Sequence, residues 1–244
     1  MSGDFGPSAF FKATSHAFSE TINSCRTRPE LVALLCAQAF DAFTKNVAIQ
    51  AEGEPALACQ GECEACCRLR VVASAPEIFL LARFVSVNAA AFAERGVMLE
   101  KRVADADRAV GGLSEEQRIS VQHACPLIEA GLCLAYKIRP LACRGHAAFD
   151  KDLCVSAARG EAVETPVSAA HLVVRSLVQN ALMAALRRAG LAWGLYELNG
   201  ALNCALSAPN ALEQWLSGQD PLASARIPEF DLTEASAIFD AAVS

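Results

Sequence analysis

The hydrophobic positions of this chain recur mostly three and four residues apart, which is the spacing of an amphipathic helix. This pattern predicts helices over residues 29–51, 76–94, 97–110, 166–188 and 195–206, and shorter ones over 209–216 and 233–242. Residues 1–28 alternate between polar and aromatic positions and favour an irregular arm or a short helix. Because nearly every predicted element is helical, we expect a mainly α fold with little or no β structure.

Local signals place the ends of the central helices. Ser74 is suited to cap the helix that begins at Pro76, where Glu77 lies favourably near the positive end of the helix dipole. Gly96 ends this helix, and Ser114 caps a short third helix after residues 97–110. Residues 69–73, which precede the helix that begins at Pro76, are predicted to form a short strand or an extended link. We interpret the helices over 76–110 as a scaffold hairpin.

The cysteines are the most informative residues, because eight of the eleven fall into two blocks. The first block holds Cys59, Cys63, Cys66 and Cys67, and the second holds Cys125, Cys133, Cys143 and Cys154. The predicted hairpin separates the two blocks and would bring them together. Cys25 and Cys36 lie outside both blocks, and we interpret them as small buried hydrophobic residues.

The spacing of the thiols predicts a metal centre made of sulfur ligands. Thiolate is a soft ligand that suits zinc, copper(I) and iron–sulfur clusters. Cys63 and Cys66 have the separation that lets one turn direct two sulfurs at one metal. Cys66 and Cys67 are adjacent, which favours two different metals or two irons of one cluster. Eight thiols are twice the complement of one tetrahedral ion, so we expect an iron–sulfur cluster or iron, with zinc as the alternative.

Composition limits the class of protein. The chain has 244 residues, of which 53% are hydrophobic, and this content supports a substantial core. Its formal net charge is −6, and no part is strongly basic, so nucleic-acid binding is not expected. The N-terminus lacks the pattern of a secretory signal, and apolar runs such as residues 177–186 are shorter than a membrane span. We expect a cytoplasmic location, where clustered cysteines favour metal over disulfides.

Residues 123–154 contain two prolines and two glycines, and we expect mostly loops and short turns there. Tyr136 and Arg139 are predicted to anchor this loop, with Arg139 pairing to a carboxylate or to carbonyl groups. Arg144 and His146, next to Cys143, are the candidates for contact with a cluster sulfur or an anionic substrate, and hence for catalysis. His123 and His146 are also weighed as metal ligands in place of a cysteine.

Three ordered motifs resemble a known family. They are the run from Cys59 to Arg68, the run Cys125-Pro126-Leu127 with Gly131-Leu132-Cys133, and the run from Tyr136 through Arg139-Pro140 to Cys143-Arg144. Together with residues 71–78, they resemble the zinc- or iron-chelating CxxCxxCC family, the YkgJ type. The chain departs from the pattern with three residues, among them Gly61, between Cys59 and Cys63. The resemblance implies metal binding, and its relatives include a flagellin lysine methylase.

Three functions follow from these observations. The first is a redox or modifying role at an iron–sulfur or polynuclear iron centre. The second is a structural zinc module that binds another protein, and the third is a metal-dependent enzyme that modifies a protein or peptide. The predicted organisation is a single domain over residues 1–244. Its parts are an N-terminal helical arm (1–58), a cysteine-cluster core (59–154) and a C-terminal helical part (155–244).

Overall fold

The computed structural model describes residues 6–59 and 63–243. It is 63% helical with 5% strand, which confirms the predicted mainly α fold. The three residues between Cys59 and Cys63, where the chain departs from the family pattern, lie outside the described residues. In chain order, the helices are α1 (Pro7–Cys25), α2 (Glu30–Gln50), α3 (Ala75–Ala93), α4 (Leu99–Val110), α5 (Glu115–Val121), α6 (Leu141–Gly145), α7 (Lys151–Ala158), α8 (Ala169–Arg188), α9 (Leu198–Ser207), α10 (Ala211–Leu216) and α11 (Leu232–Val243).

Short elements connect these helices. The 3₁₀ turns are η1 (Ala65–Arg68), η2 (Tyr136–Ile138) and η3 (Ala223–Ala225). Strand β1 (Val72–Ala73) pairs antiparallel with β4 (Tyr196–Glu197), and β2 (Ile128–Glu129) pairs antiparallel with β3 (Leu132–Cys133). The β1–β4 pair joins the segment after the first cysteine block to the start of α9, more than a hundred residues later.

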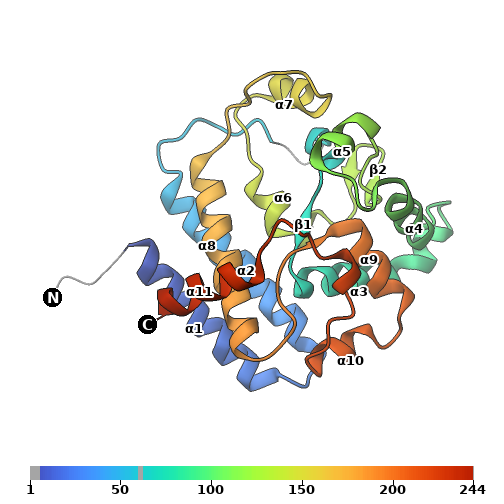
Figure 1. Ribbon diagram of the computed structural model, residues 1–244. Coiled ribbons are helices and arrows are strands. Elements are labelled where there is room, and N and C mark those ends of the chain that lie inside the picture. The colour runs from blue at the N-terminus through green and yellow to red at the C-terminus, as the bar shows by residue number, and fades with distance from the viewer. Residues whose placement is uncertain (1–5, 60–62, 244) are drawn as a thin grey trace.

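The first part of the chain is more regular than its sequence suggested. Instead of an irregular arm or a short helix, α1 has 19 residues and packs along α8, as the blue and orange helices of Figure 1 show. Its buried positions Phe11, Phe18 and Ile22 are spaced for one helical face, but Ser15 on the same face is polar and hides the period. Arg188 of α8 donates hydrogen bonds to the hydroxyl and the carbonyl of Ser15, which satisfies these buried groups.

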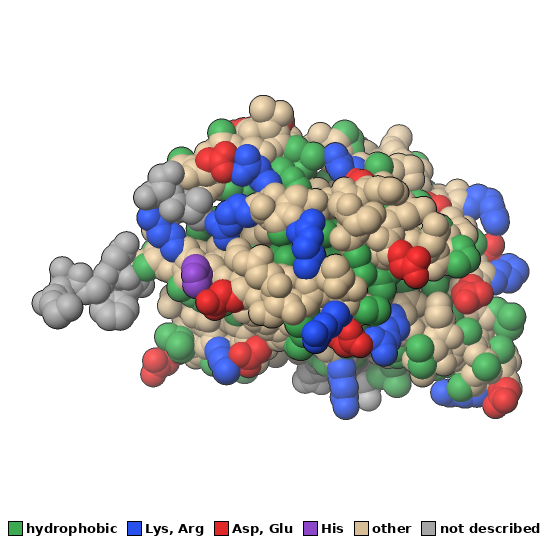
Figure 2. Space-filling view, turned by 90° about the horizontal axis from the view of Figure 1, so that it is seen from below, with side chains coloured by type: hydrophobic (Ala, Val, Ile, Leu, Met, Phe, Trp, Pro, Cys, Tyr) green, Lys and Arg blue, Asp and Glu red, His purple; other side chains and the backbone are tan. Residues whose placement is uncertain are grey.

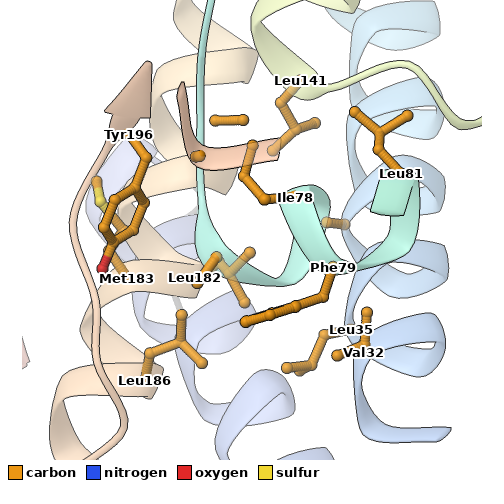
Figure 3. Packing of buried hydrophobic residues seen from close by; sticks show 14 of the residues in the cluster. Val32, Leu35, Ile78, Phe79, Leu81, Leu141, Leu182, Met183, Leu186 and Tyr196 are labelled. Atoms are coloured by element: carbon orange, nitrogen blue, oxygen red, sulfur yellow. The ribbon is translucent and has the colours of Figure 1, made fainter. Parts of the chain in front are cut away.

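Helix α8 lies at the centre of the hydrophobic core. Leu182, Met183 and Leu186 on this helix are fully buried and face the residues of α3 and α2, as Figure 3 shows. Ile78 and Phe79 come from α3, and Val32 and Leu35 come from α2. Leu141, at the start of α6, reaches the same core and is completely buried. The core therefore fixes the position of the short helix that carries Cys143.

Three helices in the described part of the chain are long and apolar enough, by length and composition, to cross a membrane. They are α2, α3 and α8. The sequence analysis expected apolar runs shorter than a membrane span because it ended each run at a polar residue, whereas a helix of this kind can include a few polar residues. In the structure, these helices pack against one another in the common core. On the face in Figure 2, Lys and Arg side chains are interspersed with Asp and Glu side chains.

Glu77 connects two helix ends inside the protein. Its Oε2 atom accepts hydrogen bonds from the backbone N–H (2.8 Å) and the hydroxyl (2.7 Å) of Ser74, forming the capping box of α3. Its Oε1 atom accepts a hydrogen bond of 2.6 Å from the backbone N–H of Leu141. Burial raises the pKa of Glu77, whereas these hydrogen bonds and the charge of Arg144 act in the opposite direction. One carboxylate therefore aligns α3 with α6.

We predict that Glu77→Gln destabilises the protein. Gln would place an amide N–H₂ against the N–H of either Ser74 or Leu141, leaving a buried donor without an acceptor. The expected loss in the free energy of unfolding is about 1–3 kcal/mol. Chemical denaturation followed by circular dichroism measures it, with Glu94→Gln at the exposed end of α3 as the control. Equal denaturation midpoints for Glu77→Gln and the unmodified protein would show that this connection is not needed.

Candidate metal centre

Five of the eight clustered cysteines lie on short elements, and Cys59, Cys63 and Cys125 lie in connecting segments. Cys66 and Cys67 are in η1, Cys133 is at the end of β3, Cys143 is in α6 and Cys154 is in α7. In Figure 1, α5, α7 and β2 lie toward the top of the view, and α6 lies beside the upper end of α8. Residues 123–154 are thus more ordered than the expected loops and turns. The sequence signal was weak because α6 has five residues and α7 has eight, too few to show a helical period.

Backbone hydrogen bonds join the two cysteine blocks. The N–H of Cys125 donates to the carbonyl of Cys67 at 2.8 Å, so the blocks meet directly at these two residues. At the other edge, the N–H of Ala58 donates to the carbonyl of Ala148 at 2.9 Å, and the N–H of Ala148 lies 3.3 Å from the sulfur of Cys59. The predicted convergence of two remote segments is therefore present in the backbone itself.

The adjacent thiols of η1 interact with each other and differ in acidity. A hydrogen bond from Cys67 lowers the pKa of Cys66 to about 7, and the positive charge of Arg139 acts in the same direction. The same hydrogen bond, together with burial, raises the pKa of Cys67. Cys66 is therefore the thiol of this pair that ionises more readily.

The sulfurs of Cys125, Cys133 and Cys143 in the second block lie close enough to one another for their charges to interact. Burial raises the pKa of Cys143, and negative charge on Cys125, Cys66 and Cys133 raises it further. Burial, together with the charge of Cys133, raises the pKa of Cys125 to about 11. Cys67 also interacts with Cys125 and Cys143. This set therefore combines sulfurs from η1, β3, α6 and the segment before β2.

A second set of interacting thiols lies around Cys154 on α7. Burial raises the pKa of Cys154 to about 11, with further contributions from the charges of Cys59, Cys66 and Cys63. Cys59 has a raised pKa as well, mainly from burial, and interacts with Cys66 and Cys63. Cys66 is the residue common to both sets. The eight predicted site cysteines thus form two neighbouring groups that meet at η1.

These sulfurs fit a thiophilic metal in chemistry and in convergence. Buried thiols that repel one another as thiolates are the groups whose charge a metal cation compensates. Within residues 6–59 and 63–243, however, no group of three or more His, Cys, Asp or Glu side chains has the arrangement of a metal site. The ligand geometry would therefore form as a metal draws the sulfurs together, which is usual where binding is coupled to local folding.

Arg139 and Arg144, the arginines near Cys143, hold the backbone of the second cysteine block. The guanidinium of Arg139 lies 3.8 Å from the ring centre of Tyr136 and donates a hydrogen bond to the carbonyl of that residue. This confirms the predicted anchoring. Arg144 lies 3.9 Å from the ring centre of Phe40 and donates to the carbonyls of Arg139 and Lys137. Its guanidinium is therefore occupied by the backbone and an aromatic ring.

The two histidines of this region are placed differently from each other. His123 has its Nδ1 atom 2.9 Å from the carbonyl of Ala124. His146 is partly buried, and burial together with the charge of Arg175 lowers its pKa, which favours the neutral imidazole. In the described part of the chain, no imidazole of these two residues has a hydrogen bond to a cysteine sulfur. Ligation by His123 or His146 stays a prediction, as does a catalytic role for Arg144 or His146.

A buried ion pair behind the second block was not predicted. Arg118 of α5 is 2% exposed, and its Nη1 atom lies 3.5 Å from Oε1 of Glu197. Its Nε atom donates to the carbonyl of Arg68, next to η1. The charge of Arg118 lowers the pKa of Cys125, and that of Glu197 raises it. The sequence shows only a polar residue on a short helix, because its partner comes 79 residues later.

The comparisons with known proteins agree with this arrangement. Residues 58–160 match the model of the CxxCxxCC family, described as a putative zinc- or iron-chelating domain. No curated protein and no solved structure matches the chain. The match spans about two-fifths of the sequence and includes all eight cysteines of the two blocks. The resemblance seen in the cysteine motifs is thereby confirmed as a match of residues 58–160 to the CxxCxxCC family model, and this match supports metal binding by the cysteine cluster.

Proposed function

We propose that this protein holds a polynuclear iron centre, of the iron–sulfur type, in residues 58–160 and uses it for a redox or modifying reaction. The observation that carries the proposal is the pair Cys66 and Cys67, whose adjacent sulfurs belong to interacting groups of thiols from four other segments. Adjacent cysteines cannot easily bind one ion together. A centre with more than one metal, or two neighbouring centres, uses both.

The number of sulfurs supports more than one metal. Cys67, Cys125, Cys133 and Cys143 form one group, Cys59, Cys63 and Cys154 form the other, and Cys66 interacts with both. Four cysteines are the usual complement of a cubane iron–sulfur cluster and of a structural zinc ion. When bound, an iron–sulfur centre supplies electron transfer or acts as an electrophile.

The surrounding residues would tune such a centre by charge and by burial. Arg139 interacts favourably with ionised Cys66 and Cys133, and Arg118 does so with Cys125. Positive groups near cluster sulfur raise the reduction potential of an iron–sulfur centre, whereas limited solvent exposure lowers it, because reduction makes the centre more negative. These arginines are otherwise held by backbone carbonyls, so their charges are fixed in place. The chain thus provides both ligands and a stable electrostatic environment.

Metal analysis separates this proposal from its alternative. We expect protein purified without oxygen to contain more than one iron per chain, to contain acid-labile sulfide and to absorb visible light. Inductively coupled plasma mass spectrometry and a sulfide assay measure these quantities. A colourless protein with zinc in place of iron would contradict the iron proposal. It would instead favour a structural zinc module that docks a partner, a role that closed four-cysteine sites commonly have.

Cysteine variants test which sulfurs hold the metal. We expect Cys143→Ser and Cys154→Ser each to lower the metal content by about half or more, because each removes one ligand from a different group. Cys25→Ser and Cys204→Ser are the matched controls, since both residues are partly buried and lie outside the two groups. Metal per chain is measured on folded, monodisperse samples. Full metal content in both test variants would place the centre elsewhere.

Metal removal should loosen the cysteine-bearing segments selectively. Helices α6 and α7 are short, and their ends depend on sulfurs drawn to a common centre, so their stability should depend on occupancy. We expect hydrogen exchange in residues 123–158 to accelerate after treatment with a strong chelator, while α8 stays protected in the core. If residues 123–158 exchanged at the same rate with and without metal, the centre would not stabilise this region.

A further inference from the structure

A cavity of about 410 Å³ lies beside the cysteine cluster, between η1 and α7. Cys63, Glu64 and Arg68 line one wall, and Lys151 and Arg159 come from the start and the end of α7. This volume lies within the range of pockets that take small molecules. Since Cys63 is one of the proposed ligands, the cavity places a bound molecule next to the metal centre.

The charge of this cavity is opposite to that of the protein as a whole. Three cationic side chains, those of Arg68, Lys151 and Arg159, line it together with one carboxylate, that of Glu64. The chain has a formal net charge of −6. A locally positive cavity on an acidic protein concentrates and orients anions at that place.

Two of these cations have no partner among the residues that the structure describes. Arg68 is held, because its Nη1 atom donates to the carbonyl of Gln122 at 2.8 Å and its Nη2 atom lies 3.6 Å from Glu64. In contrast, neither the ammonium of Lys151 nor the guanidinium of Arg159 forms a hydrogen bond or an ion pair with any described residue. Both charges are therefore available to a ligand.

One residue in the wall of the cavity, Gln122, has an unusual backbone conformation. Gln122 has φ of 54°, in the left-handed region that a residue other than glycine seldom adopts. This conformation directs its carbonyl to Arg68, while its side-chain amide donates to the carbonyl of Ala158 on α7 at 2.6 Å. One residue thus ties both walls together and fixes the spacing of the cations across the cavity.

We propose that this cavity binds a small oxyanion, a molecule that carries a phosphate or a carboxylate group, beside the metal centre. Guanidinium and ammonium groups are the side chains that recognise such groups. The role of the anion as a substrate of the centre rests on the proposed function, whereas its binding does not. The occupied guanidinium of Arg144 makes this cavity the better anion site than the segment after Cys143.

The test is a calorimetric titration of the full-length, metal-containing protein at constant ionic strength. Inorganic phosphate is the probe in one arm, and succinate is the probe in the other. The double variant Lys151→Gln/Arg159→Gln removes the two unpaired charges. The control Lys12→Gln/Arg83→Gln removes two exposed cations on α1 and α3, outside the cavity and also without a partner among the described residues.

We expect saturable binding of at least one probe, weakened about tenfold or more in the double variant and unchanged in the control, since two ion pairs are lost. The probe that binds more tightly identifies phosphate or carboxylate as the preferred group. No saturable binding of either probe, or equal affinity in the double variant and the control, overturns the inference. Metal content is measured on the same samples: if iron is present while no anion binds, this inference alone fails, and if iron is absent, the proposed function fails.

Discussion

The gathering of like-charged sulfurs is the constraint on which this structure depends. Eight thiols from two remote blocks lie near one another, and each thiolate disfavours the ionisation of its neighbours. Such an arrangement is unfavourable unless protons or a metal cation compensate the charge. Burial first, and the charges of neighbouring thiolates in addition, raise the pKa values of Cys125 and Cys154. A bound metal would remove this repulsion and use the gathered sulfurs as ligands.

The helical body holds these segments in place from outside the cluster. The β1–β4 pair fixes the chain after the first block, and the hydrogen bond between Cys125 and Cys67 fixes the approach of the second. Glu77 ties the end of α3 to α6, so that Cys143 takes its position from the hydrophobic core. The helical body therefore orders the cysteine-bearing segments from one side.

The sequence predicted features whose cause is local. Ser74 and Ser114 precede their helices directly, and both form capping boxes in the structure. The clustering of cysteines likewise indicated that the two blocks meet. Features that depend on distant partners were not predictable. The length of α1 was underestimated because the polar Ser15 faces the core, where Arg188 donates a hydrogen bond to it. The burial of Arg118 likewise depends on its ion pair with Glu197. The ligand set itself stays a prediction, since thiol spacing does not determine which sulfurs bind.

The most direct test of this account is X-ray absorption at the iron edge of the protein purified without oxygen. The account requires sulfur ligands around each iron and a second iron at the short distance found within a cluster. It therefore predicts a first shell made of sulfur, together with a clear iron–iron scattering contribution. A first shell of nitrogen and oxygen, or an isolated metal without a metal neighbour, would contradict a polynuclear centre assembled from both cysteine blocks.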